Sequence, residues 1–234
     1  MKSIKTLALV TGLLAVSGVS QAQFSSTWTA VSDYDFRGVS QSAKDPALQA
    51  SADYAFANGL SIGAWASNID FGDFNDEDVE LDLYLNYAGK INDTFTWTAG
   101  GTLYMYPAGD DQDDYPEIYV GFNAGAFSFK QWYSWDFGAL PESVDALYSE
   151  VNYTAPIGEK FSLAFHAGYA YGDYWDSIEQ FDYAVQGNFV AGNFTIFGKF
   201  TGTDASGAAK VEGDAFNNEP RFLIGVMTTF PWGD

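Results

Sequence analysis

The chain has 234 residues, a formal net charge of −21 and no cysteine. This length fits one domain of ordinary size, and the lack of cysteine excludes disulfides and thiolate metal sites. So acidic a chain does not favour nucleic acid or anionic lipid head groups as partners. Aromatic residues nevertheless make up 18% of it, which is not typical of acidic disordered proteins.

The first 22 residues predict a secretory signal peptide. Lys2 and Lys5 supply the positive start, residues 7–16 form the apolar run, and Ser20 and Ala22 are the small residues before a cleavage site. The alternative is an uncleaved inner-membrane anchor, for which the apolar run is short. We therefore expect a signal peptide at 1–22 and a mature domain at 23–234, more acidic still because two lysines are removed.

The mature chain alternates apolar and polar residues with the period of a β-strand. For example, Val79, Leu81 and Leu83 share one face, while Glu80 and Asp82 share the other. No later stretch has the apolar length of a membrane helix or a helical period. The pattern predicts about twelve strands, at residues 24–36, 48–56, 60–70, 79–87, 95–105, 117–122, 126–137, 144–153, 161–171, 181–190, 194–203 and 220–230.

The connections between these strands alternate in length. Asn58-Gly59 is a two-residue hairpin signature, and short connections recur near residues 89–93, 125, 154–160 and 191–193. Those between them are mostly longer and acidic, with residues 138–143 as the exception. This alternation is typical of an up-and-down barrel with one rim facing the periplasm and the other facing outside. It places both termini on the short-turn side.

The predicted fold is therefore all-β, a transmembrane up-and-down antiparallel β-barrel after an N-terminal signal peptide. In lipid every backbone amide must be paired, so only a closed sheet is tolerated, with its apolar face toward acyl chains and its polar face lining the lumen. A soluble β-sandwich is the competing interpretation, but it rarely needs so many aromatic residues. Rings near strand ends suit interfacial girdles, namely Trp28, Tyr34, Phe36, Tyr87, Tyr106, Trp135, Tyr153 and Tyr171.

The segment "DYDFRGVSQSAKDPALQASADYAFANGLSIGAWASN" resembles the start of the TorF-family porins, a proteobacterial group also known as Gcw_chp. Ala50 follows Gln49 where glycine is common in the family. The resemblance implies an outer-membrane barrel in a Gram-negative bacterium, and a porin function less directly. The matching residues are Tyr34, Arg37, Gly38, Ser40, Pro46, Ala47, Gln49, Asp53, Tyr54, Trp65, Ser67 and Asn68.

Strand parity predicts which charged side chains line the lumen. The candidates are Asp33, Asp35, Arg37, Asp53, Glu80, Asp82, Glu117, Lys130, Asp136, Glu150, His166, Asp182, Lys199 and Arg221. Parity places Arg37 at the outer end of the first strand, either as a free cation at the lumen mouth or in a salt bridge to Asp33, Asp35 or Asp53. An acidic wall favours cations. The alternative is a packed ion network that closes the lumen.

The acidic loops at residues 110–114 and 73–82 have oxygen ligands for Ca²⁺ but lack the spacing of an EF-hand. We expect solvated loops bridged to lipopolysaccharide by divalent ions, outer-membrane lipid as the surroundings, and no cofactor or resident metal. Neither a GxGxxG motif nor a P-loop occurs.

The sequence predicts a channel for small polar solutes that prefers cations. A closed structural or adhesin-like barrel with acidic extracellular loops is the alternative. A lipid hydrolase centred on His166 is a third hypothesis. Ser162 lies about 13 Å along the strand from His166, so a nucleophile would have to come from another strand.

Overall fold

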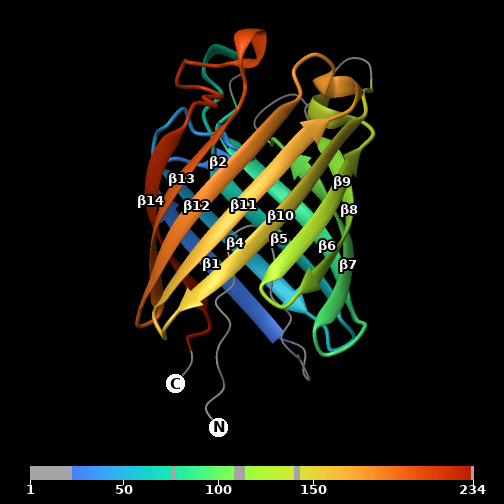
Figure 1. Cartoon of the computed structure of the whole chain (residues 1–234), viewed down its shortest axis with the longest axis vertical. Helices are drawn as coiled ribbons and strands as arrows, with labels where there is room; N and C mark the ends of the chain where they lie inside the picture. The colour runs from blue at the N-terminus through green and yellow to red at the C-terminus, as the bar shows by residue number, and fades with distance from the viewer. Residues whose placement is uncertain (1–22, 75–76, 108–113, 140–142, 233–234) are drawn as a thin grey trace.

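Twelve antiparallel strands close into one barrel in the computed structural model, which describes residues 23–74, 77–107, 114–139 and 143–232 (Figure 1). The predicted signal peptide and residues 110–113 lie outside these ranges. The strands are β1 (Gln23–Val31), β4 (Ala47–Ala55), β5 (Leu60–Asn68), β6 (Val79–Lys90), β7 (Phe95–Met105), β8 (Tyr115–Ala124), β9 (Phe127–Ser134), β10 (Ala146–Ile157), β11 (Phe161–Tyr171), β12 (Gln180–Ala191), β13 (Phe194–Thr203) and β14 (Arg221–Phe230).

Each barrel strand pairs with its neighbours in chain order, and β14 pairs with β1 to complete the ring. Ser26 lies opposite Phe230 and Val31 opposite Gly225 at this closing seam. The predicted up-and-down antiparallel barrel is therefore confirmed. A closed sheet leaves no unpaired edge, which is the condition for a β-structure in contact with lipid.

The turns at one end are short and the connections at the other end are long, as the sequence predicts. In Figure 1, β1 begins and β14 ends at the lower, short-turn end. In its described residues, the long-loop end carries four short 3₁₀ turns, η1 (Gly72–Phe74), η2 (Phe137–Ala139), η3 (Asp173–Trp175) and η4 (Gly207–Ala209).

The barrel is apolar outside and polar inside. On β8, Ile118 and Val120 are 48% and 62% exposed, whereas Glu117 and Tyr119 are 2% and 5% exposed. The same alternation runs along the other strands. Apolar side chains therefore face outward and polar side chains face inward, the reverse of the arrangement in a soluble protein. Among the described residues, no helix is long and apolar enough to cross a membrane.

The first predicted strand is too long. β1 ends at Val31, and the connection to β4 contains a separate two-stranded hairpin, β2 (Asp35–Phe36) and β3 (Val39–Ser40). Similarly, β9 ends at Ser134, so Asp136 follows the strand and is not on the barrel wall.

Three of the rings predicted for the interfacial girdles lie elsewhere. Tyr34 and Tyr106 are buried and Phe36 packs against the same apolar cluster at the long-loop end. Trp28, Tyr87, Trp135 and Tyr153 are exposed, between 38% and 48%. Their position in the chain near a strand end could not distinguish an inward-facing ring from an outward-facing one.

We expect the mature chain to fold in detergent micelles or lipid vesicles and to aggregate in plain buffer, because its outer face is apolar. Far-UV circular dichroism, together with a shift in electrophoretic mobility on boiling, measures this. A monodisperse, folded protein in buffer without amphiphile would contradict the membrane interpretation.

Candidate functional site

The β2–β3 hairpin folds into the barrel from its long-loop end. Arg37 and Gly38 form its two-residue turn with φ of 51° and 81°, the left-handed pair that tight hairpins require. Gly38 lies against β13, where a methyl group would meet the Thr203 side chain at 2.7 Å and the Gly202 carbonyl oxygen at 2.8 Å. The turn therefore needs glycine both for its backbone conformation and for its close approach to β13.

Two acidic residues of the hairpin segment are bound by cations of the barrel wall. Arg221 of β14 donates to Asp33 and Asp35 and to the Gly38 carbonyl oxygen. Lys199 of β13 pairs with Asp35 at 2.6 Å. These contacts attach one side of the hairpin to the last two strands.

Arg37 reaches the opposite wall. Its two terminal nitrogens donate to both carboxylate oxygens of Glu117 on β8, at 3.0 and 2.7 Å. Its guanidinium also lies 4.0 Å from the ring centre of Tyr148 and 4.7 Å from that of Phe36. Arg37 is therefore in a salt bridge, but with Glu117 and not with the predicted Asp33, Asp35 or Asp53. It is neither on the first strand nor a free cation at the lumen mouth.

These ion pairs shift the pKa values of two hairpin side chains, Asp35 and Arg37. Burial alone would raise the pKa of the Asp35 carboxyl, but Lys199 and Arg221 outweigh it and hold that pKa below its usual range. Burial alone would lower the pKa of Arg37, but the Glu117 carboxylate raises it. Because the pKa of Asp35 is depressed, its stabilising contribution is present at neutral pH and is lost only as pH falls through that lowered value.

Aromatic rings cover the hairpin at the long-loop end. Phe71 stacks on Phe216 at 4.7 Å and meets Tyr106 at 5.8 Å, and Phe137 packs edge-on to Tyr174 at 4.7 Å. The buried apolar cluster that includes Phe71, Tyr106 and Phe137 also includes Tyr34. These aromatic residues of the long connections thus pack together with the hairpin segment.

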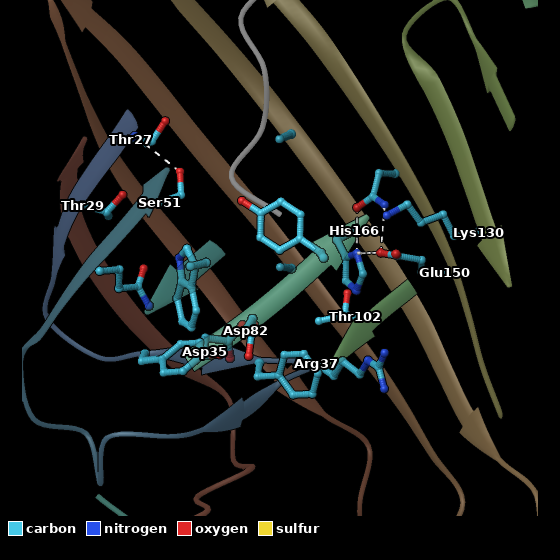
Figure 2. A pocket seen from close by; sticks show the side chains of 18 of the residues that line it. Thr27, Thr29, Asp35, Arg37, Ser51, Asp82, Thr102, Lys130, Glu150 and His166 are labelled. Carbon is cyan, nitrogen blue, oxygen red and sulfur yellow. Dashed lines mark hydrogen bonds and ion pairs between the residues drawn. The ribbon is translucent and has the colours of Figure 1, made fainter. Parts of the chain in front are cut away.

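A cavity of about 470 Å³ lies in the lumen, and all twelve barrel strands line it. Figure 2 shows Thr27, Thr29 and Ser51 on its wall, with Arg37 and Asp35 at the hairpin. The lining extends to Gly59 in the short turn after β4. Among the described residues of the long connections, only 33–38 line it, so the hairpin bounds the cavity toward the long-loop end.

The structure brings most of the predicted lumen residues together. Glu80 accepts from the Tyr34 hydroxyl, and Asp53 accepts from Tyr84 and Ser51. Lys130 is buried, with its ammonium 4.0 Å from the Tyr119 ring centre. The predicted residues that line the cavity are Asp33, Asp35, Arg37, Asp53, Asp82, Lys130, Glu150, His166, Asp182 and Lys199.

His166 belongs to a polar cluster on the cavity wall. Its Nε2 lies 2.8 Å from Asp182 and 3.0 Å from the Tyr148 hydroxyl, and its Nδ1 lies 2.7 Å from the side-chain oxygen of Asn152. None of these partners is a serine within the described residues. The imidazole is occupied on both nitrogens, so the arrangement that a serine hydrolase needs is not formed by these groups.

Aromatic residues of the wall are the functional candidates that the charge-based prediction missed. Trp65, Tyr84, Tyr104, Trp132 and Tyr148 line the cavity beside the charged groups. Strand parity contained this information, because Tyr84 and Tyr104 share the polar faces of their strands. As for metals, the described residues contain no cluster of three or more His, Cys, Asp or Glu side chains that could hold an ion.

Comparison with protein families decides the affiliation of the chain. Residues 15–230 match a family described as "Bacterial protein of unknown function (Gcw_chp)". The chain belongs to the Gcw_chp family. The family predicted from the motif at residues 34–68 is thus confirmed under this name, and the name TorF stays a prediction. No curated protein matches the chain.

Two solved porins have a similar barrel. The NanC porin aligns with a TM-score of 0.59 at 13% identity, covering 88% of this chain and 99% of its own. The KdgM porin aligns with a TM-score of 0.57 at 13% identity, with the same coverage. A second KdgM structure, described as a complex with disordered oligogalacturonate, has a TM-score of 0.56. At this identity the likeness establishes the fold alone.

We expect Arg37→Ala to destabilise the folded barrel by about 3–5 kcal/mol, because Glu117 would be left as an unpaired buried carboxylate. Replacing both partners by Arg37→Met and Glu117→Leu should recover most of this loss. Urea unfolding in lipid vesicles, followed by tryptophan fluorescence, measures the difference.

The matched control is Lys90→Ala, which breaks the exposed Lys90–Asp93 pair in a short turn. An exposed pair contributes at most about 1 kcal/mol. If Arg37→Ala costs no more than Lys90→Ala, the hairpin is not held by this ion pair.

Proposed function

We propose that the protein is an outer-membrane channel for small polar solutes, with the lumen as its pathway and the β2–β3 hairpin as its constriction. The observation that carries the proposal is the cavity lined by all twelve strands, which has charged side chains on its wall and is bounded by the hairpin. The apolar outer face and the likeness to porins support a place in the outer membrane of a Gram-negative bacterium, among its lipid and lipopolysaccharide.

Wall charge favours cations over anions. Six carboxylates line the cavity (Asp33, Asp35, Asp53, Asp82, Glu150 and Asp182), against three Lys or Arg side chains (Arg37, Lys130 and Lys199). Acidic walls select cations. Oligogalacturonate, named with one KdgM structure, is a polyanion. We therefore do not extend that ligand to this chain, and we propose neutral and cationic solutes instead.

A closed barrel is the second candidate. The hairpin is bound to opposite walls and packed beneath the aromatic cluster, which is the arrangement of a plug. In that case the acidic outer connections would be the working part of the protein. Conductance separates the two functions, because a channel must open around or through the hairpin and a structural barrel need not.

In a planar bilayer we expect the refolded protein to conduct and, in a salt gradient, to give a reversal potential of cation preference. Asp53→Asn should reduce that preference, because Asp53 lies on the cavity wall. Glu212→Gln removes an exposed carboxylate in the connection before β14 and is the matched control. Its field decays over about 8 Å at physiological salt, so it should change little.

Anion preference in the parent protein would contradict the charge argument. Absence of conductance in the parent and in Arg37→Ala alike would favour the closed barrel.

We expect the long connections to face the cell exterior. The chain has no cysteine, so single substitutions can be labelled cleanly. Ser206→Cys, exposed in a long connection, should react with a membrane-impermeant maleimide on intact cells. Asn193→Cys, exposed in the short turn between β12 and β13, should react only after the outer membrane is permeabilised. Labelling of Asn193→Cys alone on intact cells would reverse the topology.

A further inference from the structure

Lys130 on β9 differs from the other described Lys and Arg side chains that line the cavity. Arg37 pairs with Glu117, and Lys199 pairs with Asp35. Lys130 is only 5% exposed, and its ammonium forms no ion pair or hydrogen bond with any described residue. An ammonium has three N–H donors, and a buried charge without an acceptor is costly. The wall therefore holds a cation whose donors the described chain does not use.

Two aromatic rings hold this ammonium in place. Its nitrogen lies 4.0 Å from the ring centre of Tyr119 and 4.5 Å from that of Trp132. Ring faces attract a cation without replacing a hydrogen-bond acceptor. None of the described side-chain nitrogens is both cut off from solvent and without a hydrogen bond. The Lys130 ammonium therefore keeps accessible surface, and its donors are available to a solute in the cavity that Lys130 lines.

Glu150 on β10 is the direct neighbour of Lys130 across the sheet. Figure 2 shows the two side chains beside each other on the cavity wall, next to His166. They form no ion pair with each other, because the Glu150 oxygens accept from the Trp132 indole at 2.9 Å and from Asn152 at 3.1 Å. A carboxylate oxygen can accept a second bond. The cavity wall thus presents a positive and a negative group side by side that are not bonded together.

This arrangement suits a solute that carries both charges. A simple anion is attracted by Lys130 and repelled by Glu150, and a simple cation meets the reverse. The Cβ atoms of directly opposed residues in an antiparallel sheet lie only about 4.5–5.5 Å apart, so the two charges of the solute must also be close together. The ammonium and carboxylate on one carbon of an α-amino acid meet this condition. The 470 Å³ cavity has space for such a molecule.

We propose that Lys130 and Glu150 form a binding site for zwitterionic α-amino acids in the lumen. The carboxylate of the amino acid accepts from the Lys130 ammonium, and its ammonium lies toward the Glu150 carboxylate. The inference names a substrate class for the proposed channel and rests on that function. A zwitterion has no net charge, so it belongs to the neutral solutes that an acidic lumen admits.

The test uses L-alanine, propanoate and ethylammonium at neutral pH. Propanoate is alanine without its ammonium, and ethylammonium is alanine without its carboxylate. Ligand-detected NMR titration of the refolded protein in lipid nanodiscs, with empty nanodiscs as the blank, measures binding without requiring conductance. We expect L-alanine to bind and each of the other two to bind at least about tenfold more weakly, the usual effect of losing a charged hydrogen bond.

Lys130→Met should weaken L-alanine binding by about tenfold or more. Glu150→Gln keeps an acceptor for the Trp132 indole but removes the negative charge, so it should weaken L-alanine binding and strengthen propanoate binding. Lys160→Met, at an exposed turn between β10 and β11, removes the same charge as Lys130→Met outside the lumen and should leave the affinities unchanged. Circular dichroism and heat-dependent mobility check that each variant is folded.

Propanoate that binds the parent protein as tightly as L-alanine would overturn the zwitterion site in favour of a simple anion site. Ethylammonium that binds as tightly as L-alanine would also overturn it, and so would unchanged affinity in Lys130→Met, the result expected if Lys130 pairs with Glu150 instead. A protein that conducts but binds no L-alanine keeps the channel and loses this inference. One that binds L-alanine without conducting keeps the site and loses the channel.

Discussion

The pairing of buried charges between the hairpin and the wall is the constraint on which this lumen depends. Arg221 and Lys199 face the interior of the barrel, where a cation without a counter-charge is costly. Asp33 and Asp35 supply that counter-charge from the hairpin segment, and Arg37 supplies it for Glu117 on the other side. The hairpin and the wall each carry buried charges whose counter-charges lie on the other. Each therefore stabilises the position of the other.

This constraint gives the family motif a structural meaning. Most of its residues are buried or half-buried, and Pro46, Tyr54 and Asn68 are the exposed ones. Arg37 and Gly38 make the turn, Ser40 donates to Asp33, and Tyr34 packs on Trp65. Asn68 binds the backbone on both sides of Ala47, where the hairpin segment rejoins the barrel. The motif describes an inserted loop and its attachment points.

The barrel could be predicted from the sequence, whereas the hairpin could not. The two-residue period and the alternating connection lengths can be read from neighbouring residues in the sequence. Strands such as β11 and β13 therefore match the prediction almost residue for residue. The same period extended the first strand through Phe36, because Asp33–Phe36 continue the alternation after the strand has ended. Parity states which face a residue occupies but not which strand lies across the lumen, so the Arg37–Glu117 pair required the closed ring.

Ion pairing also means that the number of charges on the wall does not by itself set the electrostatic field in the lumen. Three lumen acids are neutralised locally, since Asp33, Asp35 and Glu117 each pair with a Lys or Arg side chain. A neutralised carboxylate contributes mainly short-range dipoles to the field that a passing solute meets. The acids without a basic partner, Asp53 and Asp82, lie on β4 and β6, while the paired cations concentrate on β13 and β14. The acids without a basic partner therefore lie on strands that do not carry Lys199 or Arg221, so a count of wall charges does not describe how charge is distributed around the lumen.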